Sequence, residues 1–203
     1  IIMYAIGPQR ANVLNASYGT DFYTDSYFFI KQLISLGLSL FAFFLMGKLP
    51  LDRLYKNSGK ILILGYASCL LLAIFGFLSV PLAKCELGAC RWYNLGPLGS
   101  IQPSEFLKLA LLLSLSVFLG AKAATGKINN FKETLLPAGL LIVFAMVIIA
   151  GFQKDLGTAV SALAIVAAQL VMAGLNKKNI MRLVAAFVAM KVLFIVIAPH
   201  RLA

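Results

Sequence analysis

Charged residues are scarce in this chain, because only 12% of its 203 residues are charged and 61% are hydrophobic. A soluble domain has about 25% charged and about 45–50% apolar residues. The chain therefore has too little polar material to cover a soluble surface. Its composition excludes an ordinary soluble domain and predicts an integral membrane protein.

Acidic residues are the rarer charge, with 7 Asp and Glu against 18 Lys and Arg, and the net charge is +11. In a soluble protein such an excess would favour nucleic acid as a partner. Here the basic residues lie in short segments between apolar runs, and the sequence contains neither a basic face nor a recognition helix. We therefore expect no nucleic-acid partner and interpret these residues as determinants of membrane orientation.

Histidine and cysteine are nearly absent as well. The single histidine is His200, so no histidine pair exists for metal binding or proton relay, and we predict no metal site. Among the three cysteines, Cys69 lies inside an apolar run and is interpreted as a small buried hydrophobe. Cys85 and Cys90 share one short segment and can pair if it faces an oxidising compartment, but their spacing alone leaves this open.

Long apolar runs are what the chain has in abundance. About 20 apolar residues in a helix cross a hydrocarbon core of about 30 Å. By this measure we predict six complete transmembrane helices, at residues 27–47, 61–80, 104–121, 134–152, 156–174 and 183–198. Residues 1–6 look like the end of an earlier helix. The expected fold is all-α, a polytopic membrane helical bundle that forms a single domain over residues 1–203.

Lys and Arg are distributed unevenly between the two sets of loops that alternate along this bundle. The richer set comprises Lys48, Arg53, Lys56, Lys60, Lys122, Lys127, Lys132, Lys177, Lys178 and Arg182. The poorer set comprises Arg10, Lys84, Arg91, Lys154 and Arg201. Loops rich in Lys and Arg face the cytoplasm. We therefore place the segment with Cys85 and Cys90 on the outer side.

An acid and a base begin the apolar run that follows this outer segment. Glu105 and Lys108 are three residues apart, so on a helix they share one face. Ser104 can cap that helix, and Pro103 suits its first turn. Glu105 also suits the helix N-terminus, but Lys108 does not and requires an anion nearby. Both an interfacial salt bridge and a functional site remain open.

Other charged residues occur at the outer ends of the apolar runs. Asp155 is either an N-cap or, with Lys154 and the first-turn amides, part of an anion site. Arg91 and Trp92 are either interfacial anchors or ligands of an anionic group, because an outer Arg opposes the charge rule. Together with Arg201 these residues can line one basic, outward-opening cavity. Such a cavity suits an anionic lipid-linked headgroup.

The motifs around these residues resemble those of the SEDS family, the FtsW, RodA and SpoVE type of proteins. The family's Arg-Trp, Gln-Pro-Ser-Glu and Lys pattern matches Arg91, Trp92, Gln102, Pro103, Ser104, Glu105 and Lys108. Its Asp-Leu-Gly-Thr-Ala motif matches residues 155–159, although Lys154 stands where the family often has Pro. Its Pro-Tyr-Arg-Leu motif resembles residues 199–202, with His200 at the Tyr position. The overall similarity of the sequence, rather than any one motif, favours the FtsW branch.

The resemblance implies a ten-helix fold, of which this chain holds the end of helix 1 through helix 7. The large extracellular loop and the last three helices would be missing, and the fragment alone would be inactive. It implies a peptidoglycan glycosyltransferase of the bacterial inner membrane that polymerises lipid II. The implied partners are lipid II, a class B penicillin-binding protein and other divisome or elongasome membrane proteins. A divalent cation, Mg²⁺ or Mn²⁺, is the one cofactor it allows.

The resemblance also assigns roles to individual residues. The catalytic Asp is expected beyond residue 203, so this chain offers no catalytic residue to name. Supporting residues of the cavity are expected to be Glu105, Lys108 and Asp155. Ligands of the substrate phosphates or headgroup are expected to be Arg91, Trp92, Gln102, Ser104 and Arg201. Two alternatives stay open: a flippase or transporter of lipid-linked precursors, and a non-catalytic membrane scaffold for a cell-division complex.

Overall fold

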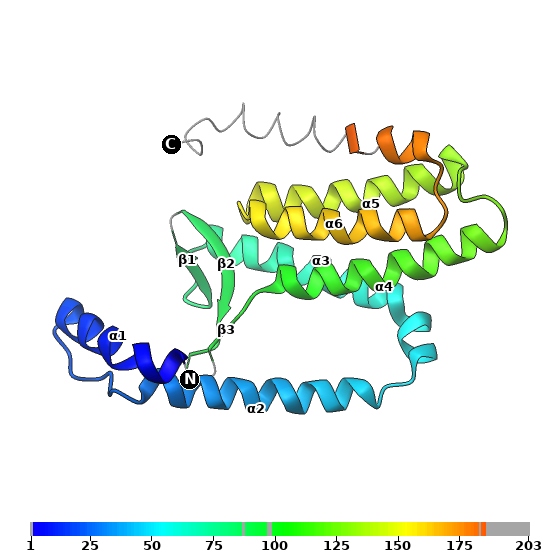
Figure 1. Ribbon diagram of the computed structural model, residues 1–203. Coiled ribbons are helices and arrows are strands. Elements are labelled where there is room, and N and C mark those ends of the chain that lie inside the picture. The colour runs from blue at the N-terminus through cyan, green and yellow to red at the C-terminus, as the bar shows by residue number, and fades with distance from the viewer. Residues whose placement is uncertain (1, 87, 97–98, 183, 186–203) are drawn as a thin grey trace. The chain divides into compact units, whose positions relative to one another are not determined.

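The fold is helical with one small sheet. The computed structural model describes residues 2–86, 88–96, 99–182 and 184–185 (Figure 1). The chain forms two compact units, Ile1–Leu51 and Asp52–Ala203. Apolar helices of membrane-spanning length dominate, as the composition predicted. The sheet was not predicted.

The first unit consists of two helices, α1 (Ile2–Tyr18) and α2 (Tyr27–Gly47). The bounds of α2 are those of the predicted span. Residues 2–6 are helical, as expected for the end of an earlier helix, but α1 continues beyond residue 6 to Tyr18 and includes Pro8. Apolarity detects only the part of a helix that suits lipid, and the polar residues of α1 continue the helix beyond that part. The Asn15 side chain closes the turn between the two helices by donating to the Tyr23 carbonyl (2.8 Å) and accepting from its amide (3.0 Å).

The second unit contains the helices that carry the motifs. They are α3 (Leu51–Phe77), α4 (Pro103–Ala124), the continuous helical segment η2 (Phe131–Leu135), α5 (Leu136–Met146) and η3 (Val147–Phe152), and α6 (Leu156–Met172). With α2, the helices α3, α4 and η2–η3 are long and apolar enough to cross a membrane. The helix α6 is apolar but shorter than the predicted span 156–174. Apart from residues 184 and 185, the predicted span 183–198 lies outside the described residues, as does Arg201.

Helix α3 begins earlier than predicted, at Leu51 rather than residue 61. Its first turns contain Arg53, Lys56 and Lys60, which are good helix formers although they are not apolar. A search for apolar runs therefore misses this part of the helix. The basic first turns lie at the end of the helix opposite to the sheet (Figure 1).

The core of this unit lies around α4. Its buried leucines recur every four residues and therefore lie on one face of the helix; they are Leu107, Leu111, Leu115 and Leu119. Gly65 of α3 packs closely here, because a Cβ at Gly65 would lie 3.1 Å from Leu107 Cδ1. The Tyr66 hydroxyl donates to the Leu141 carbonyl at 2.6 Å and joins α3 to α5.

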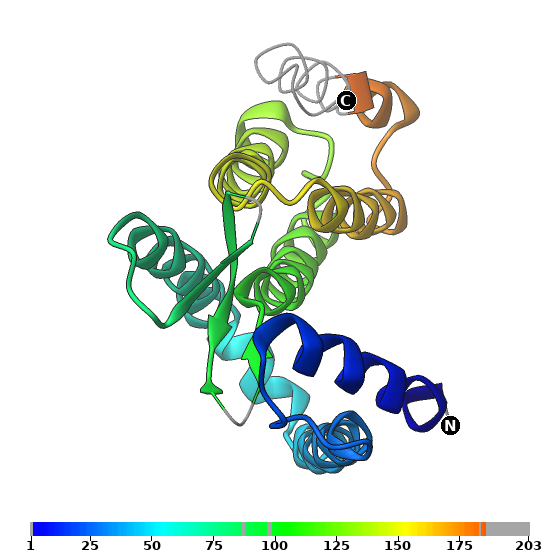
Figure 2. The ribbon, with the colours of Figure 1, turned by 90° about the vertical axis from the view of Figure 1, so that its left-hand side faces the viewer.

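A three-stranded antiparallel sheet follows α3, in the order β1 (Ala83–Glu86), β2 (Ala89–Asn94) and β3 (Ser100–Ile101). It lies at one end of the helices α3–α6, which are seen nearly end-on in Figure 2. Cys85 and Cys90 are register partners on β1 and β2 and form a disulfide, which settles the pairing left open by their spacing. The Tyr93 hydroxyl donates to the Ser68 carbonyl (2.6 Å) and ties the sheet to α3.

Candidate functional site

The corner between η3 and α6 is the centre of the candidate site. It consists of Gln153, Lys154 and Asp155, between the last residue of η3 and the first residue of α6. The η3 segment is a π-helix, a wide helical turn that is rare and occurs often at functional sites. Lys154 has a positive φ of 52°, and the Gln153 side chain is fully buried. The chain therefore bends sharply just before the acid.

Asp155 caps α6 and links that helix to the start of α4. Its Oδ1 accepts a hydrogen bond from the Thr158 amide at 3.0 Å, which is the capping role expected from the sequence. Its Oδ2 accepts from the Thr158 hydroxyl at 2.8 Å and from the Gln102 side-chain amide at 2.8 Å. The carboxylate thus fixes two helix N-termini relative to each other.

These contacts also favour the ionised form of Asp155. Burial alone would raise the pKa of this carboxyl group. The hydrogen bonds from Thr158 and Gln102 and the positive charge of Arg91 outweigh that effect and hold the pKa below its ordinary value. Asp155 is therefore a carboxylate at neutral pH.

Lys108 is the largely buried base of the site. Its Nζ lies 2.8 Å from Glu105 Oε1, and its side chain is 14% exposed, whereas the Glu105 side chain is 56% exposed. The same Nζ donates to Ser161 Oγ of α6 at 3.2 Å. Ser161 in turn donates to the Thr158 carbonyl at 2.9 Å. The ammonium therefore lies between α4 and α6, and its anion comes from its own helix.

Arg91 reaches the corner from the sheet. Its Nε donates to the Gln153 carbonyl at 3.1 Å, and its Nη2 donates to the Lys154 carbonyl at 2.8 Å. Lys154 donates from Nζ to the Gly88 carbonyl at 2.9 Å. Arg91 is thus held by the two carbonyls that precede Asp155.

The structure brings most of the predicted site residues into one network, which we call the corner network: Arg91, Gln102, Glu105, Lys108, Lys154, Asp155, Thr158 and Ser161. Within the part of the chain that the structure describes, Trp92 makes no polar contact with this network, and it is 37% exposed on β2. Ser104 is buried completely, and its hydroxyl finds no hydrogen-bond partner in the described part of the chain. The helix begins with Gln102 as N-cap, so the expected cap by Ser104 is wrong. Arg201 lies outside the described residues.

Two members of the corner network were not anticipated from the sequence. Thr158 follows Asp155 by three residues on α6 and Ser161 follows Thr158 by three, so each successive pair lies on the same side of the helix. A polar stripe at that spacing within an apolar helix would have been a usable signal. Gln153 gave no such signal, because its burial depends on the turn that η3 makes.

The described residues do not provide a ready cation site. Within residues 2–86, 88–96, 99–182 and 184–185, no group of three or more His, Cys, Asp or Glu side chains could hold a metal ion. Asp155 already accepts three hydrogen bonds, and Glu105 is paired with Lys108. These residues alone do not fit a resident divalent cation, and we derive no step through one.

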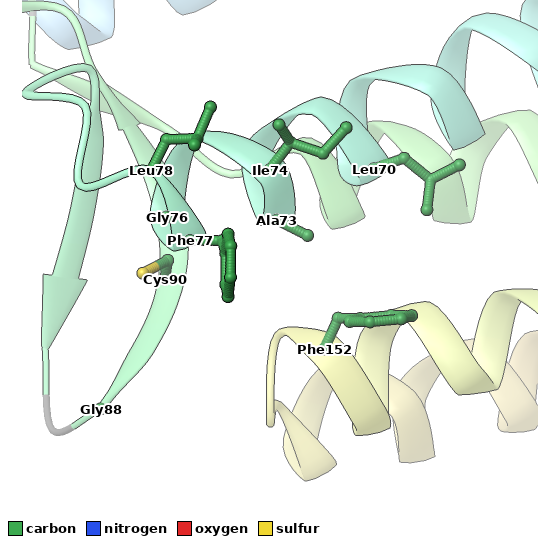
Figure 3. A pocket seen from close by; sticks show the side chains of 9 residues that line it. All are labelled: Leu70, Ala73, Ile74, Gly76, Phe77, Leu78, Gly88, Cys90 and Phe152. Atoms are coloured by element: carbon green, nitrogen blue, oxygen red, sulfur yellow. The ribbon is translucent and has the colours of Figure 1, made fainter.

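An apolar cavity of about 500 Å³ lies beside the corner network, between α3, the β1–β2 hairpin and the end of η3 (Figure 3). Its lining residues are Leu70, Ala73, Ile74, Gly76, Phe77, Leu78, Gly88, Cys90 and Phe152. In the close-up, Leu70, Ala73 and Phe77 extend from α3 toward Phe152. No charged side chain lines this cavity among the described residues. Its chemistry suits hydrocarbon rather than a headgroup.

Membrane-length apolar helices with a charged network at one end define a polytopic membrane protein. The model of the cell cycle protein family that groups FtsW, RodA and SpoVE matches residues 11–203. The chain belongs to this family, as its motifs predicted. Membership and the apolar helices together make it a multi-pass protein of the bacterial inner membrane.

Curated relatives agree with this assignment. The chain is 30% identical over 174 residues to a probable peptidoglycan glycosyltransferase FtsW of Allochromatium vinosum, covering 85% of this chain and 41% of that protein. It is 28% identical over 201 residues to a protein of the same name from Saccharophagus degradans, covering 98% and 50%. It is 30% identical over 159 residues to stage V sporulation protein E of Bacillus subtilis, covering 78% and 41%. The chain thus spans half or less of the length of these relatives.

Solved structures show the same fold. The rod shape determining protein RodA of Thermus thermophilus aligns with a TM-score of 0.61 and 27% identity, covering 93% of this chain and 57% of that chain. A chain of a peptidoglycan synthase complex, described as coordinating polymerization and crosslinking, aligns with a TM-score of 0.60 and 27% identity. That alignment covers 86% of this chain and 47% of that chain.

Proposed function

We propose that the full-length protein is a peptidoglycan glycosyltransferase that polymerises lipid II, and that this chain supplies part of its substrate site. The observation that carries the proposal is the corner network, which brings acids and bases from the sheet, α4 and α6 to one end of the bundle. Its lysine and arginine suit the phosphates of a lipid-linked sugar. Membership in a family with members named as peptidoglycan glycosyltransferases supports the same function.

The proposed reaction joins two lipid-linked sugars. A base removes the proton of a sugar hydroxyl on one substrate, and that oxygen attacks the anomeric carbon of the other. The new carbon–oxygen bond forms as the bond to the lipid pyrophosphate breaks, and the pyrophosphate leaves with its negative charge. We expect the base to be an Asp beyond residue 203. The role left for this chain is to bind and orient the charged groups.

Some hydrogen-bond donors in the corner network have no partner among the described residues and are suited to that role. A lysine ammonium has three donors, of which Glu105 and Ser161 take two at Lys108. An arginine has five donors, and the two carbonyls bound by Arg91 leave most of them available. Donors fixed in place before the reaction stabilise charge that develops on a leaving group. We therefore assign the leaving pyrophosphate to the side of the network where Arg91 and Lys108 lie.

The apolar cavity fits the other half of such a substrate. A lipid-linked sugar has a hydrocarbon chain next to its pyrophosphate, so its site needs apolar surface beside cationic donors. The cavity reaches Phe152, the residue before Gln153. We place the first hydrocarbon units of the lipid there.

We further propose a transpeptidase partner, a class B penicillin-binding protein. The support is the structural relative from a complex that coordinates polymerization and crosslinking. Co-purification of the full-length protein with that partner from membranes tests this. The use of Mg²⁺ or Mn²⁺ stays a prediction for the full-length protein.

The function is tested by lipid II polymerisation with the full-length protein in lipid nanodiscs. Lys108→Ala and Glu105→Gln are expected to slow glycan-chain formation strongly, to a low but measurable rate, while the protein remains folded. Lys56→Ala is the matched control, because Lys56 is an exposed lysine near the opposite end of α3. Normal polymerisation by both site variants would remove the corner network from the site. A wild type that transports lipid II but does not polymerise it would favour the flippase alternative. A wild type without either activity would favour the scaffold.

A further inference from the structure

The β1–β2 hairpin packs against α3 through its disulfide. Cys85 and Cys90 face each other across the two strands and are bonded. Cys90 packs against Gly76, where a Cβ would lie only 2.6 Å from Cys90 Sγ and 2.8 Å from Cys90 Cβ. Only glycine leaves room for this contact. The disulfide therefore sets where the hairpin sits on the helix.

The residue after Cys90 points the other way. Side chains alternate along a strand, so Arg91 leaves the opposite face of β2 from Cys90. There it binds the Gln153 and Lys154 carbonyls, and Lys154 binds the Gly88 carbonyl of the hairpin turn in return. We call this set of three hydrogen bonds, together with the disulfide, the hairpin clamp.

Lys154 has a conformation that needs such support. Its φ of 52° lies in the left-handed region, which residues other than glycine adopt infrequently. A backbone held there persists when its surroundings fix it. Arg91 binds the carbonyl on each side of the Lys154 Cα and so restrains both of its backbone dihedrals.

The conformation of Lys154 determines where Asp155 points. The peptide that joins them precedes the Asp155 Cα directly, so a change there moves the carboxylate. Three hydrogen bonds from Thr158 and Gln102 depend on that position. We propose that the hairpin clamp is a positioning device for Asp155, with Arg91 and Lys154 as its positioning residues and the Cys85–Cys90 disulfide as its anchor. Only its effect on catalysis rests on the proposed function.

Through the hairpin clamp, reduction of the disulfide should affect the position of Asp155. When a dithiol such as dithiothreitol reduces it, the S–S bond breaks and each sulfur takes up one electron and one proton. The dithiol loses those two electrons and two protons and closes its own disulfide. The close packing of the bonded sulfurs on Gly76 then loosens, and with it the contacts of Arg91 with the corner.

Hydrogen exchange of the Thr158 amide measures the clamp directly, because this amide donates to Asp155. The experiment uses the full-length protein in nanodiscs without substrate. Lys154→Pro fixes φ near −65° and forbids the left-handed turn. We expect it to speed exchange of this amide by about tenfold or more, the effect of losing a hydrogen bond to a charged group. Lys154→Asn tolerates the left-handed turn and loses only the Nζ contact, so its exchange should fall between Lys154→Pro and wild type.

The disulfide is tested in the same way. Cys85→Ser with Cys90→Ser, or reduction of the wild type by dithiothreitol if that variant fails to fold, should also speed exchange at Thr158. Cys69→Ala is the control, because it removes a buried thiol and leaves the disulfide intact. Wild-type exchange at Thr158 in both Lys154→Pro and the reduced protein overturns the clamp, whether or not the protein polymerises lipid II. If the exchange rates at Thr158 are as expected but the wild type does not polymerise lipid II, the clamp is retained and only the proposed function is rejected.

Discussion

Gln102 and Asp155 are 53 positions apart in the chain, and the Gln102 Nε2 donates to Asp155 Oδ2 at 2.8 Å. The bond joins the residue before α4 to the residue before α6, so two helices begin at one shared point. Asp155 is an ordinary N-cap, whereas Gln102 makes no capping bond to its own helix. Their contact is what turns two separate caps into one site.

Removing the Gln102 amide should weaken this joint. Gln102→Ala deletes a hydrogen bond to a carboxylate, for which we expect a loss of about 1.5–3 kcal/mol in the free energy of unfolding. Asn at this position is too short to reach Asp155 and should behave like Ala. The melting temperature of the full-length protein in nanodiscs measures the loss, and wild-type stability in both variants would show that the bond is unimportant.

The low pKa of Asp155 predicts how stability depends on pH. The folded pKa lies below the ordinary value, so the ionised carboxylate stabilises the fold at every pH above that ordinary value. This contribution should decline as the pH falls below about 4 and disappear below the folded pKa. The stability difference between wild type and Asp155→Asn should therefore be constant from pH 7 to about pH 5 and shrink under more acidic conditions. A difference that grows on acidification would contradict the assignment.

The tight contact at Gly76 predicts opposite effects for two similar substitutions in α3. Gly76→Ala places a methyl group against Cys90 and should destabilise the protein and displace the hairpin. Gly59→Ala meets nothing within 4 Å and should stabilise the helix by about 0.5–1 kcal/mol. Thermal unfolding of the two variants, measured side by side, gives the comparison. Equal effects would mean that the hairpin does not rest on Gly76.

Removing Glu105 from its ion pair with Lys108 should destabilise the protein more than removing Lys108. Glu105→Gln leaves the buried Lys108 ammonium without its anion, and we expect a loss of about 1–3 kcal/mol. Lys108→Met leaves Glu105 with its largely exposed side chain in contact with water, and the loss should stay within about 1 kcal/mol. Chemical or thermal unfolding of both variants measures this. A larger loss of stability for Lys108→Met than for Glu105→Gln would contradict the conclusion that Lys108 is the less exposed charge.

Among the described residues, the sequence was sufficient for the apolar parts of the helices and for part of the site. The run at residues 27–47 matched α2 because apolar residues extend from one end of that helix to the other, with Lys31 and Gln32 near its start. The polar start of α3 and the later part of α1 were missed because apolarity marks the membrane-facing part of a helix and not its ends. The sheet was missed because its strands are short and half polar, and the pairing of β1, β2 and β3 stabilises them more than their composition does.

Within the site, residue types were easier to predict than contacts. Glu105, Lys108 and Asp155 stood out because charge is costly beside apolar helices. The use of the Arg91 guanidinium on two backbone carbonyls was not predictable, since it depends on the left-handed turn at Lys154. No local pattern marks a lysine for that conformation. The contact of Arg91 with these carbonyls depends on how the hairpin packs beside the η3–α6 corner, which only the structure shows.

The most direct test of the account is a double-mutant cycle on the initial rate of lipid II polymerisation by the full-length protein. It compares Lys108→Ala, Asp155→Asn and the double variant with wild type. Residues that serve one site lose activity non-additively, so the double variant should be little slower than the slower single variant. Rate losses that multiply independently, or wild-type rates in both single variants, would contradict the claim that the two charges belong to one substrate site.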